Sequence, residues 1–191
     1  MSEETIVLLE DGAPSHDDVV RHLAKSEADL IAEFSEDKAG ITHMIMGMVT
    51  ECRELVNAVF ANDRVNVKEE IGDFQFYSVG LRQALARFYD DAYAPQTFPP
   101  IYDVAGFMLQ TMNLMDFNKK NYAYDSDLNV QSLYAILDEL DSKVQAFADA
   151  QQLSMQECID HNRIKLWTKR YPNGFSNKAA TDRLDKDGAD E

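Results

Sequence analysis

Two pairs of acidic residues with helical spacing stand out in the sequence: Glu51 and Glu54, then Glu70 and Asp73. Residues three positions apart lie on one face of a helix, so each pair presents its two carboxylates together. Clustered carboxylate oxygens suit Mg²⁺ or Mn²⁺ rather than zinc or copper, which favour nitrogen and sulfur ligands. The two pairs therefore predict a Mg²⁺ site, at which Mn²⁺ is an expected substitute.

The elements that must position these acids are two predicted helices, over about residues 40–60 and 67–90. Apolar residues in the first recur with the helical period over five turns. The short polar link between the helices favours an antiparallel hairpin, which would bring Glu54 level with Asp73.

Glu51 shares a helical stripe with apolar residues, and Glu70 and Asp73 flank Ile71 and Phe74. Carboxylates at a buried edge are unfavourable unless they are paired or bind a cation. The alternative is that these acids belong to solvated helix faces, since the chain has 34 acidic residues to distribute.

Basic residues gather near the C-terminus, although the net charge of the chain is −16. Such cations would complete the neutralisation of a triphosphate bound at the metal site. The expected substrate-binding residues are Asn162, Lys165, Lys169 and Arg170. The alternative is that the basic residues only complement the C-terminus of their helix. His43 and Tyr77 are further candidates, for contact with a base or ribose, and either could instead be an ordinary residue at the edge of the core.

Composition predicts an all-α protein, because glycine, proline and alternating β-branched runs are scarce. Helices are expected over about residues 15–35, 40–60, 67–90, 101–120, 130–150 and 154–169, with Ser154 and Glu157 forming a capping box. We expect one domain over residues 1–175, in which 93–150 is an additional helical segment, and a disordered tail over 176–191.

Several classes of protein are disfavoured by the composition. An acidic surface repels a phosphate backbone, so we expect no nucleic-acid partner. No stretch approaches the length of a membrane span, and the acidic N-terminus does not resemble a secretory signal. Cys52 and Cys158 lie in apolar helical patterns, so we expect both to be reduced core residues in a cytoplasmic protein.

The strings HMIMGMVTECREL, KEEIGDFQFY and NRIKLWTKRYPNGFS resemble the MazG-like nucleoside triphosphate pyrophosphohydrolases, particularly those of bacteriophages. That family has the fold of the all-α NTP pyrophosphatases and binds Mg²⁺ through an E-E-x-x-E helix and an E-x-x-D helix. The matching metal ligands are Glu51, Glu54, Glu70 and Asp73. Thr50 stands where the family has its first glutamate, which leaves the number of metal ions open. Asn162, Lys165, Leu166, Arg170, Tyr171 and Pro172 match the family's downstream elements.

The resemblance implies hydrolysis of nucleoside or deoxynucleoside triphosphates to the monophosphate and pyrophosphate. Glu51 or Glu54 would act as the general base, while Lys165 and Arg170 would stabilise the departing pyrophosphate. The resemblance also implies a homodimer or dimer of dimers. If the protein is viral, we expect it in the host cytoplasm. A phage subgroup of the family prefers guanine nucleotides, so a purine or guanine preference is a further expectation. The alternatives are a dUTPase-like or dCTPase-like hydrolase of the same fold, and a non-enzymatic acidic helical interaction protein.

Overall fold

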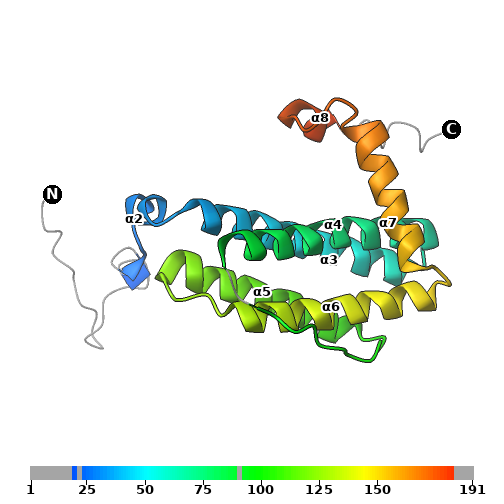
Figure 1. Ribbon diagram of the computed structural model, residues 1–191, viewed down its shortest axis with the longest axis horizontal. Coiled ribbons are helices and arrows are strands. Elements are labelled where there is room, and N and C mark those ends of the chain that lie inside the picture. Colours follow the sequence, from blue (N-terminus) through cyan, green and yellow to red (C-terminus); the bar gives the residue numbers. More distant parts are fainter. Residues whose placement is uncertain (1–18, 21–22, 90–91, 183–191) are drawn as a thin grey trace, which may run out of the picture.

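The computed structural model describes residues 19–20, 23–89 and 92–182, and this part of the chain is helical without β-strands. The predicted all-α class is therefore confirmed. Figure 1 shows the arrangement of the helices. They are α2 (Glu27–Ala32), α3 (Glu36–Ala61), α4 (Arg64–Phe88), α5 (Val104–Tyr124), α6 (Val130–Ala150), α7 (Met155–Ile164), the π-helical turn η1 (Lys165–Arg170) and α8 (Asn177–Asp182).

Helices α3 and α4 form the antiparallel hairpin that the short link predicts (Figure 1). Asn62 ends α3 in the left-handed conformation, with φ of 52°, which asparagine tolerates better than most residues. The carboxylate of Asp63 then accepts hydrogen bonds from the backbone N–H groups of Val65 and Asn66, and so caps α4. Two residues thus reverse the chain and fix the relative heights of the two helices.

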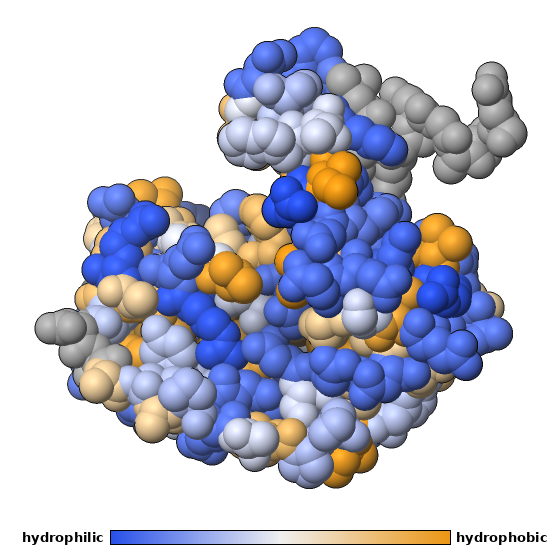
Figure 2. All heavy atoms as spheres, turned by 45° about the vertical axis from the view of Figure 1, so that its right-hand side comes forward, coloured by the Kyte–Doolittle hydropathy of each residue, from blue (hydrophilic) through white to orange (hydrophobic). Residues whose placement is uncertain are grey.

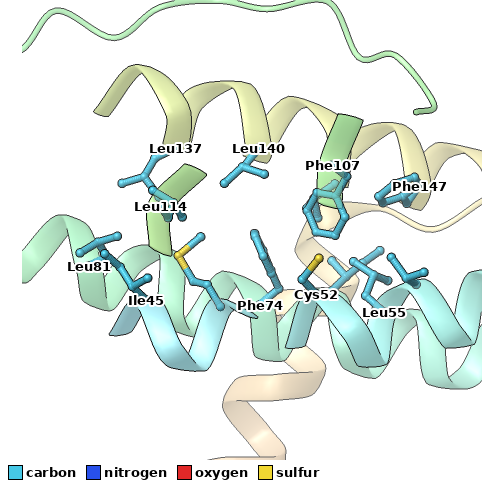
Figure 3. Packing of buried hydrophobic residues seen from close by; sticks show 14 of the residues in the cluster. Ile45, Cys52, Leu55, Phe74, Leu81, Phe107, Leu114, Leu137, Leu140 and Phe147 are labelled. Atoms are coloured by element: carbon cyan, nitrogen blue, oxygen red, sulfur yellow. The ribbon is translucent and has the colours of Figure 1, made fainter. Parts of the chain in front are cut away.

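Helices α5 and α6 form a second pair that packs against α3 and α4 (Figure 3). Phe107 of α5 joins the two layers, because its ring contacts Phe74 of α4 and Phe147 of α6 at centroid distances of 5.1 and 5.2 Å. The segment 93–150, expected as an addition, therefore supplies 9 of the 25 residues of the buried hydrophobic core. Its non-helical start, which contains Pro95, Pro99 and Pro100, lies before α5.

Helix α7 leaves the bundle across α4 and continues through η1 to α8 (Figure 1). We call residues 155–182, which contain α7, η1 and α8, the arm. The predicted capping box is present, since Ser154 and Glu157 each bond the other's backbone N–H. In η1 the helix widens, and the N–H of Tyr171 donates to the carbonyl of Leu166, five residues earlier, at 2.8 Å. Figure 2 shows the end of the arm as a lobe standing off from the bundle.

Three expectations need correction. The single helix predicted over 15–35 is interrupted, since Ser26 caps α2 and α2 ends at Ala32, although most residues before 23 lie outside the described part. Phe60, the last residue of the apolar pattern that predicts the helix over 40–60, is expected on its apolar face but is 74% exposed. The tail predicted as disordered includes helix α8, and residues 183–191 lie outside the described part.

Two expectations agree with the structure. Cys52 and Cys158 are both free and buried, as their apolar surroundings in the sequence indicate. Among the helices that the structure describes, none combines the length and the apolar character needed to cross a membrane.

We predict that Phe74→Ala destabilises the protein by about 3–5 kcal/mol, because it empties the contact between the two layers. The matched control is Phe60→Ala, at an exposed position of α3, for which we expect a change within about 0.5 kcal/mol. Urea denaturation measures both. Equal losses for the two variants would contradict the described packing.

Candidate functional site

Three of the four predicted metal ligands come together on the α3–α4 hairpin. Glu51 of α3 and Glu70 and Asp73 of α4 each offer a carboxylate oxygen, and these atoms lie within 4.8 Å of one another. We call these three residues the carboxylate cluster. Glu54 lies outside it and accepts a hydrogen bond from Arg53 at 3.0 Å, with 33% of its side chain exposed.

Burial and mutual repulsion dominate the electrostatics of the cluster. Glu70 is only 5% exposed, and one of its carboxylate oxygens is buried without a hydrogen-bond partner. Burial, reinforced by the charges of Asp73 and Glu51, raises the pKa of Glu70 from its ordinary value of 4.5 to about 8. The pKa of Glu51 is also raised, first by burial and then by Asp73. A divalent cation would supply both the missing charge and a partner for the orphan oxygen.

The arm brings positive charge to the same place. The ammonium group of Lys165 donates to both carboxylate oxygens of Asp73, at 2.7 and 2.6 Å, and to Glu69 at 3.2 Å. The side-chain amide of Asn162 also donates to Asp73. Asn162 and Lys165 are 6% and 5% exposed, so these contacts are shielded from water. Two predicted phosphate-binding residues therefore lie beside the carboxylate cluster.

Of the remaining candidates, Tyr77 lies near the carboxylate cluster, whereas His43 and Lys169 are exposed. Tyr77 is close enough to the cluster that Glu51 and Asp73 add to the raising of its pKa by burial, and Arg170 opposes it. Its ring packs on the backbone of Gly47, where an added Cβ would lie 2.2 Å away. His43 is exposed, with its ring 6.2 Å from that of Tyr77. Lys169 is exposed on η1 and makes no contact with the cluster that the structure records.

A cavity of about 1180 Å³ opens beside the site, between the arm and the upper face of the hairpin. Its lining includes His43 and Asn162, and also exposed apolar side chains from both sides: Phe76 and Val79 of α4, with Trp167 and Phe175 of the arm. The cavity is larger than most small-molecule sites, which span roughly 300–1,000 Å³. It has room for a ligand of nucleotide size.

Sequence reasoning did not single out Glu69 or Gly72. Glu69 lies one helical turn before Asp73, and the i, i+4 spacing could have indicated that both face the same lysine. Gly72 lies where α7 crosses α4, and only the tertiary structure shows that crossing. Thr50 donates its hydroxyl to the carbonyl of Gly47 at 2.8 Å and so bonds its own helix.

Chemically, this arrangement offers hard oxygen ligands, an adjacent buried ammonium and amide, and an open cavity. Comparisons with protein-family models, with characterised proteins and with solved structures find no match to this chain.

We predict that the metal-free protein loses stability as pH rises from about 5 to about 8. Within this interval folded Glu70 keeps a proton that the unfolded chain has released, because its pKa is raised from 4.5 to about 8. Stabilisation by Mg²⁺, which binds the ionised carboxylates, should grow over the same interval. Thermal unfolding across this pH range, with EDTA and with Mg²⁺, measures both effects.

Glu70→Gln should flatten the decline in the metal-free protein, because the variant has no proton to release at this position. Glu27→Gln, at an exposed position of α2, is the matched control and should leave the slope unchanged. A decline of equal slope in the wild type and Glu70→Gln would contradict the assignment of this titration to Glu70.

Proposed function

We propose that the protein hydrolyses nucleoside or deoxynucleoside triphosphates to the monophosphate and pyrophosphate, with Mg²⁺ as cofactor. The observation that carries this proposal is the meeting of the carboxylate cluster with buried Lys165 and Asn162. Carboxylates alone would suit a bare cation, and cations alone would suit a free anion. Both side by side suit a metal-bound polyphosphate. The resemblance to the MazG-like family supports the same reaction.

Glu51, Glu70 and Asp73 would hold the metal, since they are the carboxylates that converge. When bound, Mg²⁺ screens phosphate oxygens and lowers the pKa of a water ligand. Lys165 would place a positive charge against the phosphate chain, and Asn162 would keep a donor aimed at the same region. Arg170 lies close enough to Tyr77 for its charge to oppose the raising of the Tyr77 pKa. Arg170 would stabilise the departing pyrophosphate, and Tyr77 stays a candidate for contact with the base or ribose.

Glu54 suits the general base better than a ligand. Its carboxylate is outside the carboxylate cluster and a third exposed, so it can accept a proton from water without leaving a metal. In this proposal Glu51 keeps the role of ligand. The second role that the sequence allowed for Glu51, as the base, would compete with its place in the cluster.

The cavity is the proposed location of the nucleoside, with His43 at its wall. Its aromatic side chains suit stacking on a base, and a preference for purine or guanine stays a prediction. The homodimer or dimer of dimers also stays a prediction.

The two alternatives differ from this proposal in the ligand of the site: a restricted set of nucleotides in one, and no nucleotide in the other. A dUTPase-like or dCTPase-like enzyme would use the same metal ligands and differ only in base selection. A non-enzymatic interaction protein would have no need for a buried carboxylate oxygen without a partner beside a buried lysine. The unpartnered oxygen of Glu70 and the buried ammonium of Lys165 therefore favour a site that binds a ligand over a solvated acidic face.

We predict Mg²⁺-dependent release of pyrophosphate from at least one member of a panel of all common NTPs and dNTPs. Asp73→Asn should lower kcat/KM about 100-fold or more, because the variant removes a ligand and the partner of Lys165. Asp116→Asn is the matched control on α5, where the aspartate is 57% exposed, and should retain activity. Pyrophosphate and single phosphate are quantified separately.

Release of single phosphate would exclude pyrophosphohydrolysis, and turnover confined to dUTP or dCTP would favour the base-restricted alternative. No turnover, together with no shift in melting temperature on addition of Mg²⁺, would support the interaction protein. Full activity in Asp73→Asn would remove this residue from the proposed site.

Glu54→Gln and Glu70→Gln should separate the two proposed roles. We expect Glu54→Gln to lower kcat about 100-fold with the Mg²⁺ dissociation constant nearly unchanged. Glu70→Gln should instead weaken Mg²⁺ binding about tenfold or more. Isothermal titration with Mg²⁺ and steady-state kinetics make the comparison. Weaker Mg²⁺ binding in Glu54→Gln would return this residue to the set of ligands.

A further inference from the structure

We propose that Gly72 is a positioning residue, which sets how closely α7 approaches α4 and so how well Asn162 and Lys165 reach Asp73. A Cβ added at Gly72 would lie 2.7 Å from the carbonyl oxygen of Cys158 and 2.7 Å from the Cβ of Asn162. One neighbour is backbone and the other is the first atom of its side chain. Neither can rotate away, so α7 itself would have to move.

The backbone conformation of Gly72 does not explain the choice of glycine. Gly72 lies inside α4, and positive φ occurs among the described glycines only at Gly174. Glycine inside a helix is unfavourable compared with alanine, because it loses more backbone freedom on folding. The reason for glycine at this position is therefore the close crossing of the two helices.

The crossing controls the contacts of the arm with the cluster. Asn162, whose Cβ touches Gly72, donates through its amide to Asp73, the next residue of α4. Lys165 follows one turn later and holds the same carboxylate. Restoring an ordinary contact of about 3.5 Å at Gly72 requires a shift of roughly 0.8 Å. Hydrogen bonds of 2.6–2.7 Å do not tolerate such a shift without weakening.

The first test needs no activity. Lysine acetylation followed by mass spectrometry reports how accessible each amine is in the folded protein. Lys165, with 6% of its side chain exposed, should react slowly, and Gly72→Ala should speed its reaction severalfold. Lys178, with 84% exposed, is the internal standard. Gly40→Ala is the matched variant, since its added Cβ would meet only Phe88 at 3.9 Å.

An unchanged rate at Lys165 in folded Gly72→Ala would overturn the proposal. So would loss of cooperative unfolding in Gly72→Ala, because Gly72 would then be needed for the fold rather than for the placement of the arm. An equal rise at Lys165 in Gly40→Ala would also overturn it, since that substitution leaves the crossing untouched.

The second test rests on the proposed function and uses a double-mutant cycle. Gly72→Ala should lower kcat/KM about 100-fold through misplacement of Lys165. In a Lys165→Met background the same substitution should cost less than about tenfold, because Lys165 is absent and only Asn162 is still displaced. Asp116→Asn, at an exposed position of α5 outside the lining of the cavity, should stay within about twofold of the wild type. Equal losses in the two backgrounds would show that Gly72 does not act through Lys165.

The two tests distinguish a failure of the proposed function from a failure of the positioning role of Gly72. If the wild type releases no pyrophosphate, the proposed function fails, while the acetylation rate of Lys165 still decides whether Gly72 positions the arm.

Discussion

The contact between Lys165 and Asp73 is the interaction on which the site depends. It joins the arm to the α3–α4 hairpin, and it does so inside a region where Glu70 is almost fully buried. Acidic groups so close together repel one another, and burial removes the water that would screen them. The ammonium of Lys165 offsets part of this repulsion, but an oxygen of Glu70 remains without a partner. In the metal-free protein a proton on Glu70, whose pKa is raised to about 8, relieves part of the remaining repulsion, and a divalent cation would take the place of that proton.

That excess can persist because the rest of the bundle is apolar and continuous. Phe74 lies next to Asp73 and packs on Phe107, so the helix that carries two of the clustered acids is held by the core. The two-residue link at Asn62 and Asp63 fixes the other acid, Glu51, relative to them. The core therefore holds the clustered acids in place although their charges repel one another, and such local conflicts are typical of functional sites.

Much of this arrangement follows from the sequence, because it depends on helical period and on a short link. The helices over 40–60 and 67–90, the capping box at Ser154 and the proximity of Glu51, Glu70 and Asp73 were all predictable from spacing. Side-chain direction was not. Glu54 has the i, i+3 spacing of its pair, but its carboxylate accepts a hydrogen bond from Arg53 and lies outside the cluster. Helical spacing sets the face on which a side chain begins, and it does not decide which neighbour a long side chain reaches. The interruption before α2 depends on where Ser26 caps, which spacing of apolar residues does not reveal.

Contacts between distant elements account for the rest. Residues 93–150 carry good helical patterns, yet spacing within them cannot show that they complete the core. Nor can the sequence show that α7 crosses α4 at Gly72, since glycine inside a predicted helix is equally compatible with an exposed position. The arm explains why this detail matters. A lysine can neutralise a buried carboxylate only at hydrogen-bond distance, so the separation of two helix backbones decides whether Lys165 serves the cluster or merely lies near it.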